Sequence, residues 1–405
     1  MILLAGADIV LPDRVLPRGS VLLEGTRITA IEPRVIDTPR GAARVDLAGH
    51  LLIPGFIDVH VHGVDGYDVL DGADAVGHVA ARLPRYGVTA FCPTSIACRP
   101  EALGTMLGAV DRSRSGPAAS GARVLPAHLE SNFINPEYNG AQPLECVRRP
   151  PTRFAASDSA SDSGFSAREI LDTIAAHRPS VGIVTLAPEI EGGLELTRDL
   201  VNAGHIVSLG HSGASYDEAH AAIEAGLRHA THLFNRMSPM SHRSPGAVGA
   251  VLQSAQVVAE LICDGFHVHP AVMQLAIRTK GIHGIMAITD GTAGSGLPVG
   301  SRTLLGGRPV VVTERSAELD DGTLAGSVLT MDGAFRTLRR QVGLTVVEAA
   351  SLCASSPARQ LGLTETGRIE VGALADLVVL DDQLRVAQTY LAGHLWRNPA
   401  HEPLV

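Results

Sequence analysis

Short apolar runs alternate with longer amphipathic stretches through the middle of the chain. The apolar runs have the length and composition of buried strands, and residues 73–87, 166–178 and 216–226 between them show helical periodicity. This alternation is typical of parallel β/α folds, and eight such runs predict an α/β fold of the (β/α)8 TIM-barrel type. The predicted strands cover residues 55–63, 89–95, 124–131, 181–189, 205–212, 229–234, 258–265 and 284–291.

The two ends of the chain have a different pattern from the middle. Residues 1–53 contain short β-type runs separated by Gly and Pro, and residues 360–405 contain similar runs such as ADLVVLD and RVAQTYLAG. We expect both ends to form one small β-sandwich domain beside a barrel domain at residues 54–359. Residues 155–166 are rich in Ser, Ala and Asp, which predicts a flexible loop.

Composition narrows the class of protein. The 405 residues carry 33 basic and 42 acidic side chains, a net charge of −9, which argues against nucleic acid or an anionic membrane as a partner. The five cysteines show no C-x-x-C spacing, so we expect neither a disulfide framework nor a thiolate zinc site. No long apolar span is present, and the first residues are typical of a strand rather than a signal peptide, so we expect a cytoplasmic protein.

Polar side chains cluster at the carboxyl ends of the predicted strands. His60 and His62 stand at i and i+2, so both imidazoles share one face of their strand. Active sites of barrels lie at these strand ends, and imidazole with carboxylate suits Zn²⁺ or a related divalent metal. The candidate ligands are His60, His62, Glu130, His211 and His232. The alternatives are a hydrogen-bonded pair of histidines and, for Glu130, a helix cap or ion pair.

Asp290 ends the last predicted strand, where a carboxylate could act as a catalytic base. Beside a metal-activated water it can accept a proton and later return that proton to a leaving group. Alternatively, Asp290 is only a metal ligand, or a turn residue before Gly291. His128 shares a strand face with Glu130, and either a supporting or a purely structural role fits it.

Several motifs together carry a family resemblance. PGFIDVHVHG, HLE, GHS, THLFN and ITDG follow one another in the order found in metal-dependent amidohydrolases. VTLAPE, GHSGASYDEAHAAIEAG, LAGSVLTMDGAFR and GRIEVGALADLVVLD narrow this likeness, and essentially the whole chain resembles the N-acetylglucosamine-6-phosphate deacetylase family. The resemblance implies hydrolysis of N-acetylglucosamine 6-phosphate to glucosamine 6-phosphate and acetate.

The resemblance also implies roles for individual residues. It implies one metal at Glu130, His211 and His232, a possible second metal at His60 and His62, and Asp290 as general acid and base. Arg243 would reach the sugar phosphate bound by a neighbouring subunit, which implies a homodimer. The implied substrate contacts are Ala141, Gln142, Asn235, Arg236, Arg243, His267, Leu324, Ala325 and Gly326.

Elementary electrostatics favours the same phosphate contacts. An acidic protein that binds a dianionic phosphate needs a local positive site, and the guanidinium of Arg243 can bind phosphate oxygens in pairs. Arg236 and His267 could add donors, with His269 as an alternative to His267. Each arginine could equally be a solvated surface charge.

Three departures from the family pattern leave other substrates open. Ser131-Asn132 stands in place of Gly-Pro, residues 139–142 read NGAQ in place of KGAH, and Arg236 replaces the usual Ala. N-acetylgalactosamine 6-phosphate is therefore an alternative substrate. A second alternative is another amidohydrolase, acting on an N-acyl amino acid or a cyclic amide, and a third is a barrel that serves only as a binding scaffold.

Overall fold

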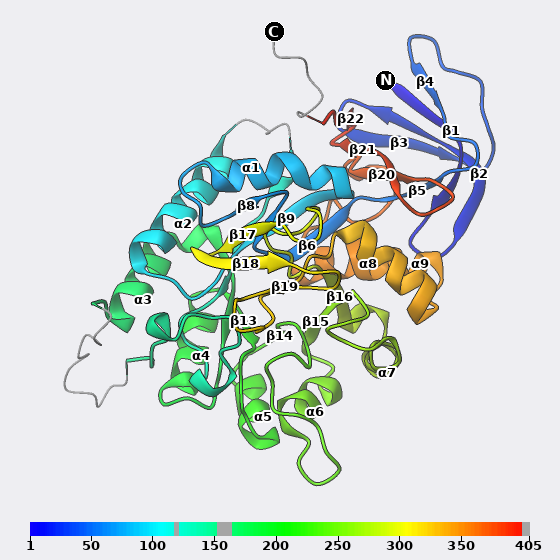
Figure 1. Ribbon diagram of the computed structural model, residues 1–405. Helices are drawn as coiled ribbons and strands as arrows, with labels where there is room; N and C mark the ends of the chain where they lie inside the picture. Colours follow the sequence, from blue (N-terminus) through cyan, green and yellow to red (C-terminus); the bar gives the residue numbers. More distant parts are fainter. Residues whose placement is uncertain (117–120, 152–163, 399–405) are drawn as a thin grey trace.

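The computed structural model describes residues 1–116, 121–151 and 164–398. Figure 1 shows a barrel surrounded by helices, with a separate sheet from both chain ends at one side. Most of the loop expected at residues 155–166 lies outside the described residues. No helix in the described part of the chain is long and apolar enough to cross a membrane.

Eight parallel strands form the barrel, and all eight match strands predicted from the sequence. Each strand pairs with the next, and β10 (Arg123–Val124) adds to the side of β9. The ring closes between its first and last strands through a parallel bridge from Val61 to Gly291. The barrel strands are β6 (Phe56–Val61), β9 (Val88–Ser95), β11 (Ala127–Glu130), β12 (Val181–Leu186), β13 (Ile206–Leu209), β14 (His229–Ala230), β15 (Val258–Ile262) and β16 (Ile285–Ile288).

Helices cover the outside of the barrel (Figure 1). Two predicted helices begin with a capping box, in which Ser166 pairs with Glu169 and Ser215 with Glu218, so local sequence fixes where they start. The helices are α1 (Ala75–Arg82), α2 (Pro100–Ser115), α3 (Ala167–Ala176), α4 (Gly193–Asn202), α5 (Tyr216–Glu224), α6 (Gly246–Gln253), α7 (Pro270–Lys280), α8 (Met331–Thr337), α9 (Val346–Ala350) and α10 (Ser356–Gln360).

The two ends of the chain share one eight-stranded sheet, as expected. Its order is β22-β21-β20-β5-β1-β2-β3, with β4 beside β1, so strands from the C-terminus join the N-terminal ones between β20 and β5. Arg123 binds Asp376 at 2.6 Å and thereby ties this sheet to the barrel. The strands are β1 (Ile2–Val10), β2 (Val15–Glu24), β3 (Arg27–Glu32), β4 (Ala43–Asp46), β5 (Leu51–Pro54), β20 (Leu377–Leu380), β21 (Val386–Leu391) and β22 (His394–Leu395).

A small sheet beside the barrel supplies one wall of the site described below. It consists of β17 (Arg302–Leu305), β18 (Arg308–Val312) and β19 (Ala317–Glu318), and a two-stranded hairpin of β7 (Gly63–Val64) and β8 (Tyr67–Asp68) lies near it. Oδ2 of Asp68 accepts a hydrogen bond from the backbone of Gly306 at 2.9 Å. Leu305 packs in one apolar cluster with Ile96, so the small sheet is anchored next to the barrel strands.

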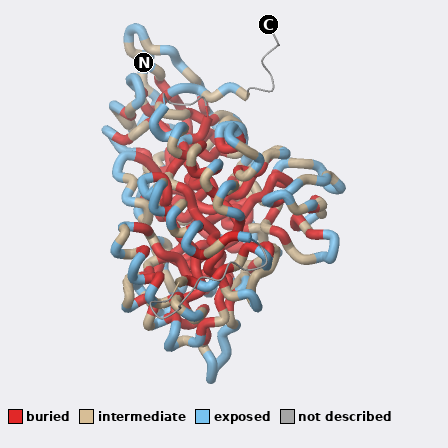
Figure 2. Tube along the Cα trace, turned by 90° about the vertical axis from the view of Figure 1, so that its left-hand side faces the viewer, coloured by how far each residue is buried: buried red, intermediate tan, exposed pale blue. Residues whose placement is uncertain are grey.

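Buried residues run through the interior of the molecule, as Figure 2 shows, and most of them are apolar. One cluster joins Ile57, Ala90, Ile183, Ile262 and Met286, which come from five different barrel strands. Because these strands lie around the ring, their inward side chains contact one another and fill the interior of the barrel. The packed interior is therefore a rigid base for the polar side chains at the strand ends.

Candidate metal centre and active site

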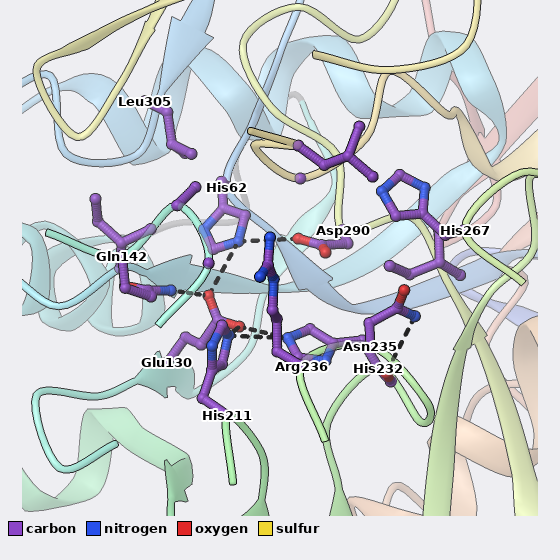
Figure 3. Close-up of a pocket in the computed structure, with 16 residues that line it drawn as sticks. His62, Glu130, Gln142, His211, His232, Asn235, Arg236, His267, Asp290 and Leu305 are labelled. Carbon is purple, nitrogen blue, oxygen red and sulfur yellow. Dashed lines mark hydrogen bonds and ion pairs between the residues drawn. The ribbon is translucent and has the colours of Figure 1, made fainter. Parts of the chain in front are cut away.

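One pocket gathers most of the candidate site residues at the carboxyl ends of the barrel strands (Figure 3). Polar groups occupy its centre, and apolar side chains from the loops and the small sheet form part of its wall. Its lining consists of His62, Ile96, Glu130, Gly140, Ala141, Gln142, His211, His232, Asn235, Arg236, Ile262, His267, Asp290, Leu305, Leu324 and Gly326.

Glu130, His211 and His232 form a compact cluster although three different strands and their following loops carry them. Oε1 of Glu130 lies 2.7 Å from Nε2 of His211 and 2.7 Å from Nε2 of His232. The two imidazole nitrogens are 3.1 Å apart. Two ring nitrogens and a carboxylate that converge so closely, all buried, match the nitrogen and oxygen donors that divalent metals take. The described residues therefore fit a cation here.

The backbone around these side chains is strained in a way that aims them at the pocket. His211, His232 and Asp290 have φ values of 49°, 31° and 49°, in the left-handed region that residues other than glycine rarely adopt. Such conformations cost free energy and persist where surrounding structure holds them, as at functional sites. For His211, Nδ1 meets the backbone oxygen of Tyr138 at 2.8 Å, which directs Nε2 toward Glu130.

Glu189 holds the loop that carries His211. Its carboxylate accepts hydrogen bonds from the Ser212 hydroxyl at 2.7 Å, the Gly213 backbone at 2.6 Å and the Asn135 side chain at 2.9 Å. Asn135 in turn donates its backbone N–H to the carbonyl oxygen of His211 at 3.0 Å. The VTLAPE motif therefore contributes a carboxylate that fixes a candidate ligand without touching it.

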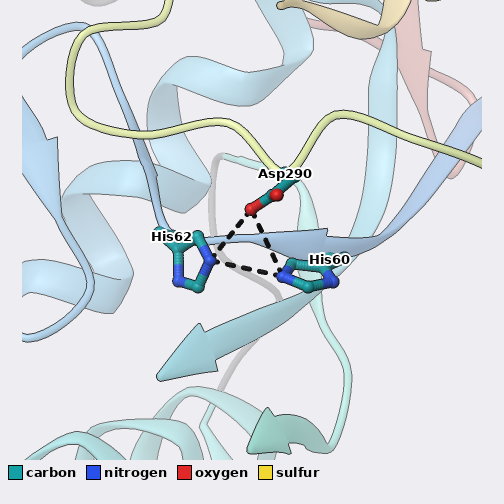
Figure 4. Close-up of side chains that lie close together, drawn as sticks. All are labelled: His60, His62 and Asp290. Carbon is teal, nitrogen blue, oxygen red and sulfur yellow. Dashed lines mark hydrogen bonds and ion pairs between the residues drawn. The ribbon is translucent and has the colours of Figure 1, made fainter. Parts of the chain in front are cut away.

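His60, His62 and Asp290 form a second compact cluster, drawn in Figure 4. Nε2 of His62 lies 3.2 Å from Nε2 of His60 and 3.1 Å from Oδ1 of Asp290. Nδ1 of His62 meets the carbonyl oxygen of Thr94 at 3.0 Å, which turns Nε2 into the cluster. Nε2 of His62 is also 3.7 Å from Oε2 of Glu130, so the two clusters adjoin. The donors of this cluster also fit a cation.

Charges inside the site keep both carboxylates ionised. Burial alone would raise the pKa of Asp290, but the nearby His60 and His62 lower it below its usual value. Burial likewise opposes ionisation of Glu130, yet His211 and His232 hold its pKa well below the usual range. Asp290 is therefore an available proton acceptor, and Glu130 an available anionic ligand.

Glu260 and His128 form a third polar group, which lies behind the second cluster and not in the pocket lining. Both side chains are fully buried. Each nitrogen of His128 already has a partner, the Val59 carbonyl at 3.0 Å and the Thr185 hydroxyl at 2.8 Å. Burial lowers the pKa of His128 to about 3, so its ring is neutral. His128 is therefore placed to support the site and not to contact a substrate.

The sequence reasoning missed Glu260, although a signal for it existed. Glu260 is the single charged residue inside the strand Val258–Ile262. A charge within a buried strand is rare unless it is paired. Glu189 was likewise noted only as part of a motif. Ile96, Gly140, Ile262 and Leu305 were also missed, because the fold brings them to the wall from loops and strands that are distant in sequence.

Most of the candidate substrate residues line the pocket. Arg236 is exposed, and its side chain makes no hydrogen bond or ion pair within the described part of the chain; Figure 3 shows this side chain extending into the pocket. Gly140 has a φ of 61°, and a Cβ atom there would lie 2.9 Å from Nε of Arg236, so glycine leaves room for the arginine. His267 lines the pocket and binds Asp264 at 2.6 Å, whereas His269 caps α7.

Three candidate residues are absent from the lining of this pocket: the candidate ligand His60, which lies behind His62 in the second cluster, and the candidate substrate residues Arg243 and Ala325. Arg243 lies on an exposed loop before α6, away from the lining of the pocket in its own chain. Ala325 is buried and packs in one apolar cluster with Ile96 and Leu305, which do line the pocket. A pocket built from one chain therefore includes Arg236 and His267 but lacks Arg243.

The departures from the family pattern have structural explanations. Gln142 donates its amide to Oε2 of Glu130, and its own oxygen accepts the Ala97 backbone N–H at 2.7 Å, so both ends of the side chain are engaged. Asn132 turns inward, where its amide donates to the Cys98 carbonyl at 2.7 Å. The Ser131 hydroxyl donates to the Thr185 carbonyl at 2.5 Å. Ser131 and Asn132 therefore shape the loop without lining the pocket.

The chain is similar in sequence to known amidohydrolases over most of its length. The model of the amidohydrolase family matches residues 51–396. N-acetylglucosamine-6-phosphate deacetylase of Lysinibacillus sphaericus is 35% identical over 363 residues, which are 88% of each chain. The mouse enzyme of the same name is 37% identical over 93% of this chain and 90% of its own. N-acetylgalactosamine-6-phosphate deacetylase of Escherichia coli O157:H7 is 35% identical over 91% of this chain and 92% of its own.

A solved structure agrees with these sequence similarities. The crystal structure of N-acetylglucosamine-6-phosphate deacetylase from Pasteurella multocida superposes with a TM-score of 0.87 at 28% identity. The superposition covers 97% of this chain and 99% of the other. The likeness thus extends over the barrel and the terminal sheet together.

Proposed function

Because the chain belongs to the amidohydrolase family, we propose that it is an enzyme that removes the acetyl group from N-acetylglucosamine 6-phosphate. The products are glucosamine 6-phosphate and acetate. The observation that carries this proposal is the convergence of Glu130, His211 and His232 beside the ionised carboxylate of Asp290, in one pocket. Its relatives named for this activity match across most of the chain.

We assign the chemistry to groups that already lie in the pocket. A divalent cation held by Glu130, His211 and His232 would polarise a water molecule and the acetamide carbonyl. Asp290 accepts a proton from the attacking water at its carboxylate. A carbon–oxygen bond forms, the carbon–nitrogen bond breaks, and Asp290 passes the proton to the departing amine, which leaves neutral. His62 contacts Oδ1 of Asp290 at 3.1 Å and holds the carboxylate in place.

We further propose that the phosphate is bound by cations from two chains. Arg236 and His267 reach the pocket within one chain. Arg243 would reach the pocket of a partner subunit, which accounts for its exposed position and requires a homodimer. Arginine suits this role because its planar guanidinium can bind two phosphate oxygens at once. We propose Zn²⁺ as the metal, since the donors are imidazole nitrogens and carboxylate oxygens.

The test is acetate release from a panel of N-acetyl hexosamines, with and without a 6-phosphate, by protein loaded with Zn²⁺. We expect N-acetylglucosamine 6-phosphate to have the highest kcat/KM and its unphosphorylated form to be much slower. Equal rates on the two forms would contradict phosphate recognition. Failure to release acetate from any member of the panel would overturn the proposed function.

N-acetylgalactosamine 6-phosphate is the second candidate substrate. It is favoured by Gln142 and Arg236, which stand where the family has other residues and which both line the pocket. The two sugars differ only in the orientation of one hydroxyl, so a single altered contact can change the preference. The same panel decides between them through the ratio of the two kcat/KM values.

A further inference from the structure

Glu260 carries a fully buried carboxylate in the middle of β15, outside the pocket lining. Its chain neighbours Ala259 and Leu261 are apolar and also fully buried. An ionised carboxylate in such surroundings is costly unless charged or hydrogen-bonding groups surround it. Its partners therefore indicate why the sequence places a charge at this position.

The carboxylate of Glu260 contacts both candidate metal clusters through separate groups. Its Oε2 lies 2.9 Å from Nδ1 of His60, in the second cluster. The same oxygen accepts the backbone N–H of His232, in the first cluster, at 3.1 Å. Its Oε1 lies 2.9 Å from Nε2 of His229, which is not a candidate ligand. Glu260 is thus joined to a ligand side chain in one cluster and to a ligand backbone in the other.

The Nδ1 atom of His60 has a different kind of partner from the Nδ1 atoms of the other candidate histidine ligands. The second ring nitrogens of His62 and His211 meet neutral backbone carbonyls. His232 Nδ1 has no partner among the described atoms. Among these imidazoles, His60 is the one whose Nδ1 faces a carboxylate. A carboxylate that accepts the Nδ1–H fixes the tautomer, directs the Nε2 lone pair into the cluster and increases its basicity.

We propose that Glu260 is a positioning residue: by fixing the ring of His60, it enables His60, His62 and Asp290 to bind a second cation. This inference rests on the proposed metal centre. The second cluster itself contains one carboxylate and two imidazoles. Asp290 exchanges a proton during the proposed reaction, and a second negative charge beside the cluster would favour a divalent ion throughout that exchange. Glu260 supplies that charge through His60 while remaining out of reach of substrate.

Metal content of the full-length protein tests this inference without any activity measurement. Wild type, E260Q and T185V are stripped with a chelator, reloaded with Zn²⁺, desalted and analysed for zinc per chain. We expect about two ions in wild type and about one in E260Q, since outer partners typically change metal affinity by about 10- to 100-fold. T185V removes a buried hydroxyl that binds His128 and does not contact His60, so it controls for damage to the polar core.

Each outcome has a distinct meaning. Two ions in a folded E260Q, or loss of one ion in T185V as well, would overturn the role of Glu260. A single ion in wild type would also overturn it, whereas no ion in wild type would overturn the proposed function itself. If E260Q fails to fold, E260D replaces it, because aspartate keeps the charge but falls short of His60. Unchanged affinity for the second zinc ion in E260D would then contradict the proposal.

Discussion

Oδ1 of Asp290 lies 3.1 Å from Nε2 of His62, although 228 positions separate the two residues in the chain. The seam between the first and last barrel strands brings them together, where the Asp290 backbone donates to the His60 carbonyl at 2.9 Å. The pairing that closes the barrel therefore also places the candidate catalytic base beside His62.

The variant D290N tests Asp290 as the general acid and base. Asparagine has the same shape but cannot accept the proton, so we expect kcat to fall by about 10²- to 10⁴-fold. Glu130, His211 and His232 are unchanged, so at least one zinc ion should remain bound. Acetate release and zinc content of the same preparation are the measurements. Acetate release near the wild-type rate would refute the role of Asp290.

The variant R236A tests the arginine that reaches the pocket within its own chain. Losing one charge-assisted contact to the phosphate should raise KM about tenfold while kcat changes little, because the phosphate is remote from the reacting bond. R198A is the matched control, since Arg198 is an exposed arginine on α4. A fall in kcat with KM unchanged would count against phosphate binding by Arg236.

Mixing two defective variants tests whether Arg243 serves a partner subunit. R243A keeps Asp290 but lacks the arginine, and D290N keeps the arginine but lacks the base. In a mixed dimer, one site has both groups, so random exchange of equal amounts should restore about a quarter of wild-type activity. The assay uses substrate well below the wild-type KM. No recovery after verified subunit exchange would show that Arg243 does not act across the interface.

Thiol labelling tests the expectation that the five cysteines form neither a disulfide framework nor a thiolate zinc site. All five are buried, and burial raises the pKa of the Cys98 thiol to about 12. The reactive thiolate forms only as pH approaches the pKa, so Cys98 should stay nearly unreactive from pH 7 to 9. Ellman's reagent should react slowly with the native protein and with five thiols after denaturation. Rapid labelling of the native protein at pH 7 would contradict this.

Periodicity predicted much of the fold and the central residues of the site. The eight barrel strands follow from apolar runs, and His60 and His62 share a strand face because of their spacing. These are local properties of the chain. Together with the rule that barrel sites lie at strand ends, they predict that Glu130 and Asp290 belong to one site.

The remaining features depend on contacts between distant segments. Gln142 binds Glu130 because a loop folds back over the strand end, and Glu260 reaches His60 across 200 positions. Periodicity contains no information on such pairs. The candidate phosphate-binding residues differ in the same way, since Arg236 extends into the pocket of its own chain whereas Arg243 is exposed and absent from the lining of that pocket. Side-chain direction at a loop is set by packing and not by the residue type.

Titration of the metal-free protein with Zn²⁺ tests most directly that deacetylation depends on the cation site at Glu130, His211 and His232. Acetate release from N-acetylglucosamine 6-phosphate is measured after each addition, with the variant E130Q in parallel. We expect no activity without metal, a rise that ends by about two equivalents in wild type, and little activity in E130Q at any of these additions. Full activity of the metal-free protein, or a wild-type response in E130Q, would contradict the proposed centre.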